Sequence, residues 1–122
     1  MKVYNLGVEA TLDIMGGKWK PLIICFLAQG TKRTGELQRC IPKISQKVLI
    51  QQLRELEQDR IVDRTVFNEL PPKVEYSITA YGLTLNAVID TMCQWGKENI
   101  LVRQRDGEAV ELIEKEYELG AK

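Results

Sequence analysis

The sequence predicts a mainly α-helical domain with one small β-hairpin, arranged in the order of a winged helix-turn-helix. Three observations predict this fold class. A proline-containing turn separates two short helical segments, two β-rich segments follow directly, and a long apolar helix comes last. Because the chain has 122 residues, we expect a single domain over 1–122.

Four helices are expected before the hairpin. The first is short and is broken by Gly16-Gly17, and the second has an apolar face that includes Trp19, Ile23 and Leu27. A short extended link follows, after which Thr34 is expected to cap the third helix. The expected ranges are 8–15, 18–29, 34–40 and 45–59.

The turn over 41–44 and the helix after it complete the expected helix-turn-helix. Pro42 disfavours helix at Ile41, and Ser45 is a favourable cap for the fourth helix. The apolar residues of that helix are expected to pack inward, and they are Val48, Leu49, Leu53 and Leu56.

Two strands and a tip are expected to form the wing. Segment 61–67 is rich in β-branched and aromatic residues, and 74–78 alternates, with Val74, Tyr76 and Ile78 on one face. The residues between them, 68–73, include Pro71-Pro72 and are expected to form the tip.

A long helix is expected over 79–101, capped by Thr79. Its apolar arc is wide, which indicates burial on more than one side. A homodimer would explain this arc. The alternatives are that the helix is central to the core of one chain, or that an acidic amphipathic helix expected over 108–119 covers it.

Composition excludes several kinds of site. The chain has no histidine, which removes Ser-His-Asp and Cys-His catalysis and His-ligated zinc. Three cysteines without a Cys-x-x-Cys pair fit neither a disulfide framework nor a four-cysteine zinc site, so we expect no metal and no cofactor. No apolar run approaches the ~18–20 residues of a membrane span, and the N-terminus does not resemble a signal peptide. We therefore expect a cytoplasmic protein that does not bind membranes.

Charge is unevenly distributed along a chain whose net charge is zero. Residues 1–105 carry 15 basic and 11 acidic side chains, whereas 106–122 carry 2 basic and 6 acidic ones. Between Gly16 and Arg54 there are eight basic residues and one acidic residue, Glu36. This segment predicts a face that binds a polyanion, although ordinary solvated charges would give the same count.

The residue types on the expected fourth helix favour double-stranded DNA as the polyanion. Glutamine pairs bidentately with adenine, and lysine or arginine pairs with guanine or phosphate. The helix N-terminus favours a phosphate near Lys43 and Ser45, and the hairpin offers Arg64 and Lys73 for further phosphates. The expected DNA-binding residues are Lys43, Ser45, Gln46, Lys47, Ile50, Gln51, Arg54, Arg64 and Lys73.

Three segments carry a resemblance to a known family. They are VEATLDIMGGKWK over 8–20, IPKISQKVL with QQLRELE over 41–57, and PPKVEYSIT over 71–79. Gly82 and Trp95-Gly96 match as well, so the similarity covers about residues 6–100. The chain thus resembles the HxlR family of bacterial winged-helix transcriptional regulators. The resemblance implies a nucleoid-associated homodimer that binds an inverted-repeat operator, with the fourth helix reading bases and the hairpin as the wing.

The same resemblance implies that the first helix and the long helix build the dimer interface, with about 79–122 supplying dimerisation helices. The residues expected there are Leu12, Leu85, Ile89, Met92 and Trp95. Many members carry a thiol-sensing cysteine just before the first helix, where this chain has Leu6-Gly7-Val8-Glu9. We interpret the three cysteines, Cys25, Cys40 and Cys93, as buried structural residues, and an inducer would be a small molecule that the sequence does not specify.

Two other classes of protein remain as alternatives. An enzyme is disfavoured, because Gly16-Gly17-Lys18 lacks the remaining residues of a phosphate-binding loop and Glu55 and Glu57 point to different faces of a helix. A winged-helix module that binds protein instead of DNA shares the fold. The basic segment argues against it, and duplex affinity that falls steeply with salt would distinguish the two.

Overall fold

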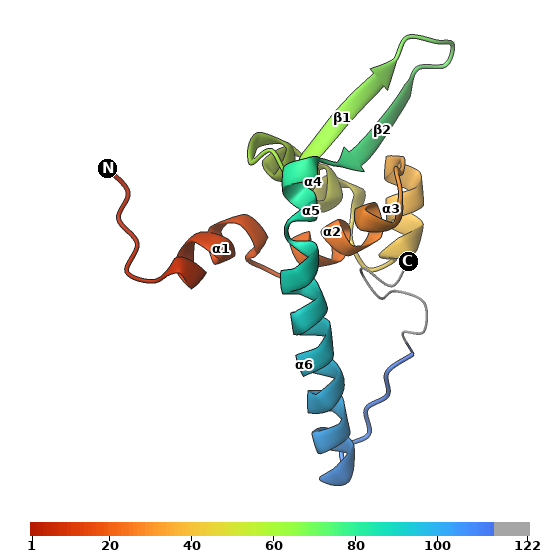
Figure 1. The fold of residues 1–122 in the computed structure, drawn as a ribbon. Helices are drawn as coiled ribbons and strands as arrows, with labels where there is room; N and C mark the ends of the chain where they lie inside the picture. The colour runs from red at the N-terminus through yellow and green to blue at the C-terminus, as the bar shows by residue number, and fades with distance from the viewer. Residues whose placement is uncertain (114–122) are drawn as a thin grey trace.

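The computed structural model describes residues 1–113, which form six helices and one antiparallel hairpin (Figure 1). This confirms the expected fold class. The elements are α1 (Gly7–Met15), α2 (Lys20–Gln29), α3 (Thr34–Cys40), α4 (Gln46–Gln58), β1 (Val62–Phe67), β2 (Lys73–Ile78), α5 (Ala80–Leu83) and α6 (Asn86–Arg105).

The core lies between α2, α3, α4 and the base of the hairpin. Leu49, Leu53 and Leu56 of α4 are fully buried, as their 3,4 spacing predicts. Val48 was expected on the same side but is exposed, because it lies about 100° around the helix from Leu49. The other fully buried side chains include Ile23, Ile24, Leu27, Leu37, Ile44, Ile61 and Val62.

Two helix starts differ from the expected ones. α2 begins at Lys20, two residues later than expected, after Gly17 adopts a φ of 87°. α3 begins with Thr34 as its first residue, so that Arg33 is the N-cap in its place. The backbone N–H of Arg33 donates to the Glu36 carboxylate at 2.8 Å, so Glu36 satisfies the group that precedes the helix.

A third extended segment pairs with the two-stranded hairpin. Val62 pairs with Ile78 at the base and Phe67 pairs with Lys73 near the tip, so the loop is 68–72 and Lys73 belongs to β2. Lys32 pairs with the other edge of β2, since its N–H donates to the Tyr76 carbonyl at 2.9 Å and its carbonyl accepts the Tyr76 N–H at 2.8 Å. The extended link before α3 therefore anchors the wing to the helices.

The segment expected to form one long helix is divided into α5 and α6. Thr79 caps α5, where its hydroxyl accepts the Gly82 N–H at 2.8 Å and donates to the Arg60 carbonyl at 2.7 Å. A side chain at Gly82 would overlap the carbonyl oxygen of Ile61, so α5 lies directly against the backbone after α4. The chain then turns at Thr84-Leu85 through bonds to carbonyls three residues back, and α6 runs away from the wing (Figure 1).

Helices α4 and α6 end in the same capping motif. After α4, Ile61 N–H donates to Leu56 and Arg60 N–H donates to Glu57, which is a Schellman motif with Arg60 at φ 65°. After α6, the equivalent bonds join 108 to 103 and 107 to 104, with Gly107 at φ 87°. The left-handed position is thus filled once by arginine and once by glycine.

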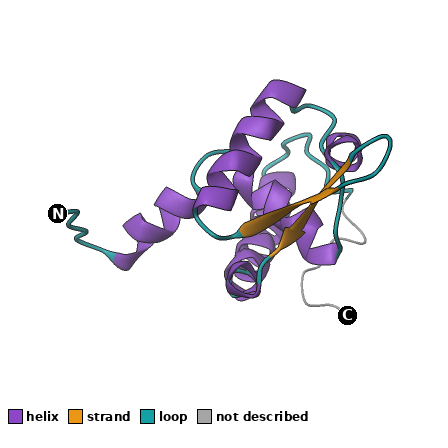
Figure 2. Cartoon of the chain, turned by 90° about the horizontal axis from the view of Figure 1, so that it is seen from above, coloured by secondary structure: helices purple, strands orange, loops and turns teal. Residues whose placement is uncertain are grey.

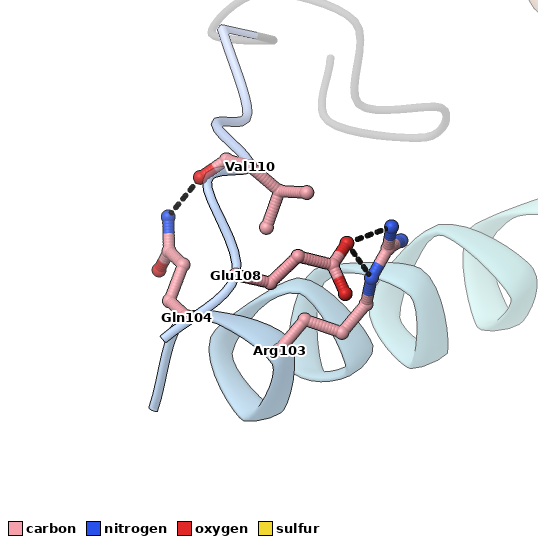
Figure 3. A network of polar contacts seen from close by, with 4 residues as sticks. All are labelled: Arg103, Gln104, Glu108 and Val110. Carbon is pink, nitrogen blue, oxygen red and sulfur yellow. Dashed lines mark hydrogen bonds and ion pairs between the residues drawn. The ribbon is translucent and has the colours of Figure 1, made fainter. Parts of the chain in front are cut away.

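The part of the chain described after α6 is not helical. Residues 108–113 of the expected 108–119 helix are non-helical, and the remainder of that range lies outside the described residues. The Arg103 guanidinium binds the Glu108 carboxylate, and the Gln104 amide donates to the Val110 carbonyl at 2.9 Å (Figure 3). These contacts, with the left-handed Gly107, direct the chain back beside α6.

Helix α1 extends to one side of the other helices in both views (Figures 1 and 2). Met15, at its C-terminal end, is its one buried residue. The apolar residues Leu6, Val8 and Leu12 are exposed. One chain alone therefore leaves most of this helix unpacked. None of the helices within residues 1–113 is both long enough and apolar enough to span a membrane.

Candidate nucleic-acid interface

The turn between α3 and α4 is fixed by its own apolar residues and by one side chain of α3. Ile41 and Ile44 are buried, and the Ile44 N–H donates to the Ile41 carbonyl at 3.2 Å. The Gln38 amide donates to the carbonyl of Ile44. The start of α4 is thereby held at a defined angle to α3, as a helix-turn-helix requires.

Helix α4 presents a polar outer face. The Ser45 hydroxyl accepts the Val48 N–H at 3.1 Å, which confirms the predicted cap. Because the leucines face inward, the outer side is left to amides and cations. Lys43, Ser45, Gln46, Lys47, Gln51 and Arg54 are exposed there, and Ile50 is half-buried among them.

A hollow of about 360 Å³ connects this outer face to the wing. Ile50, Arg54 and Glu57 of α4 line one side of it, and Arg64 and Tyr76 of the hairpin line the other. The fold therefore brings Arg54 and Arg64, ten residues apart in the sequence, to one site. Their two guanidinium groups suit a negatively charged ligand.

One expected phosphate contact is already occupied within the chain. The Lys73 ammonium lies 3.4 Å from the Glu75 carboxylate and 4.6 Å from the centre of the Phe67 ring. The structure thus separates Lys73 from the other expected cations. Among residues 1–113, no ion pair is formed by Lys43, Lys47, Arg54 or Arg64.

A charge pair beneath α4 was not found from the sequence. Lys20 is buried, and its ammonium lies 2.6 Å from the Glu55 carboxylate. The hydrogen bond from Lys20 holds the pKa of Glu55 below its ordinary value, and a second one from Gln51, at 2.8 Å, acts in the same direction. Lys20 is one of the eight basic residues between Gly16 and Arg54, but its side chain is buried and pairs with Glu55.

The five residues expected at a dimer interface fall into two groups. Leu12, Met92 and Trp95 are 58%, 50% and 70% exposed. Ile89 is only 3% exposed and belongs to the core of one chain, against which Leu85 also packs. The three cysteines are half-buried, which is less burial than we expected.

A turn held by hydrogen bonds, a capped helix with an outer face of amides and cations, and a hairpin beside that face define a winged helix-turn-helix. Folds of this class place the second helix in the major groove of DNA. Residues 14–104 of this chain match the model of the HxlR-like helix-turn-helix family. The chain belongs to this family of transcriptional regulators.

Relatives of known sequence agree with this family. The chain is 54% identical over 99 residues to the HTH-type transcriptional regulator YtcD of Bacillus subtilis (strain 168), which covers 81% of this chain and 79% of YtcD. It is 52% identical over 96 residues to the HTH-type transcriptional regulator YkvN of the same organism, covering 79% of this chain and 81% of YkvN.

Solved structures agree as well. The redox regulator HypR in its reduced form superposes with a TM-score of 0.77 at 46% identity, covering 82% of this chain and 99% of HypR. The reduced form of the transcriptional regulator YodB from B. subtilis gives a TM-score of 0.69 at 41% identity, covering 79% of this chain and 94% of YodB.

Proposed function

We propose that this protein binds an inverted-repeat operator as a homodimer and thereby regulates transcription in the cytoplasm. The observation that carries the proposal is the outer face of α4. Amides and cations that form no ion pair within residues 1–113 lie there, beside a hollow that Arg54 and Glu57 share with Arg64 of the wing. The major groove admits an α-helix, and its base edges are read by amides and guanidinium groups.

The contacts divide between bases and phosphates. Gln46, Lys47 and Gln51 lie on the exposed N-terminal half of α4, which enters the groove first in this fold class. Gln51 donates one amide proton to Glu55 and retains its carbonyl oxygen and a second proton for adenine. Ile50 is suited to apolar contact with a thymine methyl group.

Phosphate contacts frame the base-reading residues. The Ser45 hydroxyl accepts from Val48 and keeps its own proton, which can be donated to a phosphate oxygen beside Lys43. Arg54 and Arg64 would each hold a further phosphate where α4 meets the wing, and Lys47 would hold another from the first turn of α4. Lys73 would reach an additional phosphate only by giving up its ion pair with Glu75.

The homodimer would form through α1 and α6. Leu12 of α1 and Met92 and Trp95 of α6 are exposed apolar side chains that one chain does not cover. Large apolar side chains exposed on two helices of one chain support a protein interface there. Leu85 and Ile89 pack within their own chain, so they would hold α6 in place and would not contact the partner chain directly.

Selection of duplexes from a random pool, followed by binding measurements at several salt concentrations, tests this function. We expect a palindromic sequence whose half-sites are one helical turn apart, ~34 Å, or a multiple of it. Sedimentation of the free protein at micromolar concentration should give a dimer. An asymmetric winner or a monomer would contradict the proposal. Duplex affinity that is absent or independent of salt would favour a protein-binding module instead.

A further inference from the structure

We propose that the cavity between α1, the α4–β1 joint and α5 binds a small organic cation that has an apolar or aromatic body. The α4–β1 joint is residues 59–61. The cavity has a volume of about 630 Å³, which lies within the ~300–1,000 Å³ typical of sites for small molecules. It is separate from the outer face of α4, because none of the expected DNA-binding residues lines it.

The lining combines the groups that recognise such a cation. Ile14, Ile61 and Leu85 supply an apolar wall, and the rings of Tyr4 and Tyr81 lie among them. Aromatic rings attract cations through their faces. The carboxylates of Asp13 and Asp59 give the lining negative charge. The Lys2 ammonium also lines the cavity and lies 5.8 Å from the centre of the Tyr4 ring, so it offsets one of the two charges.

The two carboxylates are not equivalent. Asp13 accepts a hydrogen bond from the Tyr4 hydroxyl and lies 3.4 Å from the Lys2 ammonium, so its charge already has partners. Asp59 is half-buried, and its carboxylate has no hydrogen bond or ion pair with any residue in 1–113. Asp59 is therefore the group left to pair with a bound cation.

The position of Asp59 at the end of α4 is a second reason to expect a bound cation beside it. It is the C-cap of α4, where the helix dipole is negative and disfavours a carboxylate. Its neighbour Arg60 forms no ion pair with it within residues 1–113, although both line a smaller hollow with Gln58 and Tyr81. A ligand cation would relieve this unfavourable charge, whereas a neutral ligand of the same shape would not.

The cavity walls also connect the two functional parts of the fold. One wall is α1, proposed to form the dimer, and another is the end of α4 with the start of β1, proposed to hold DNA. A ligand between them would fix α1 relative to α4. We infer that occupancy changes DNA affinity, an effect that rests on the proposed function.

Nuclear magnetic resonance titration of the full-length protein with benzylamine tests the site without DNA. Benzyl alcohol is the neutral probe of the same shape. Asp59→Asn removes the charge, and a neutral side chain suits a helix C-terminus, so the fold should be retained. Asp106→Asn is the matched control, because Asp106 is the C-cap of α6 with the same capping motif and does not line the cavity.

We expect benzylamine to shift the amide signals of Ile61, Tyr81 and Leu85, with dissociation constants about tenfold higher for Asp59→Asn and for benzyl alcohol. Asp106→Asn should bind benzylamine as the native chain does. Absence of binding up to about 20 mM, a range that detects even millimolar affinity, would overturn the proposal. So would equal binding of benzyl alcohol, or equal weakening by the two aspartate variants.

Duplex affinity measured with benzylamine, against ammonium chloride at equal ionic strength, tests the coupling. We expect a change of at least about threefold in the native chain and in Asp106→Asn, and none in Asp59→Asn. An unchanged affinity despite demonstrated binding would overturn the coupling alone. A chain that bound benzylamine but no duplex would overturn the proposed function and leave the site standing.

Discussion

Replacement of Arg64 by glutamine should lower the salt dependence of DNA binding by a defined amount. Arg64 is exposed, forms no ion pair within residues 1–113 and shares a hollow with Arg54. Each phosphate neutralised contributes about 0.9 to the slope of log affinity against log salt. With Lys43 and Lys47 as well, four contacts per protomer give a slope of about −7 for a dimer. Loss of Arg64 from both protomers should leave about −5.4.

Fluorescence anisotropy of the selected duplex between 50 and 200 mM potassium chloride measures this slope. Over that range the native affinity should fall on the order of 10⁴-fold, and that of Arg64→Gln on the order of 10³-fold. Lys73→Gln is the control. Its slope should stay close to the native one, because Glu75 already neutralises Lys73. An unchanged slope for Arg64→Gln, or an equal loss for both variants, would refute the reasoning.

Three further predictions concern stability and are measured by urea unfolding. Leu53→Ala should lower the free energy of unfolding by about 2–5 kcal/mol, because Leu53 is fully buried and alanine would leave an empty space in the core. A loss below about 1 kcal/mol would contradict this. Arg60→Gly should raise it by about 0.5–1 kcal/mol, since glycine adopts the left-handed conformation at low cost, whereas Arg60→Ala should give no such gain. Glu55→Gln should flatten the dependence on acid pH. The pKa of Glu55 is lowered in the folded protein by Lys20, so its contribution is complete above the ordinary glutamate pKa of about 4.3 and is lost as pH falls through the folded value. Parallel curves for the two proteins between pH 6 and 3 would count against the pair.

Local patterns were enough to predict most of the fold. The leucine spacing of α4, the cap at Ser45 and the alternation of Val74 and Tyr76 each express a period or a hydrogen bond within a few residues. Signals of this kind are contained in the sequence itself. The helix-turn-helix, the wing and the outward face of α4 therefore follow from the sequence alone.

Features that depend on contacts between distant segments were not predictable. The separation of α5 from α6 depends on the close approach of Gly82 to the backbone of Ile61, about twenty residues away. The pairing of Lys20 with Glu55 has the same origin. In each case a side chain or a backbone group meets a partner that local periodicity does not specify.

The pair formed by Lys20 and Glu55 has a consequence for the approach to a polyanion. Glu55 is partly exposed on a helix that would lie against phosphates, where a bare carboxylate would repel the duplex. The buried Lys20 ammonium reduces this repulsion, because it neutralises Glu55 from the inner side of α4. Lys20→Met would remove the counter-ion, so the protein should lose affinity for every duplex sequence although each group facing the DNA is intact.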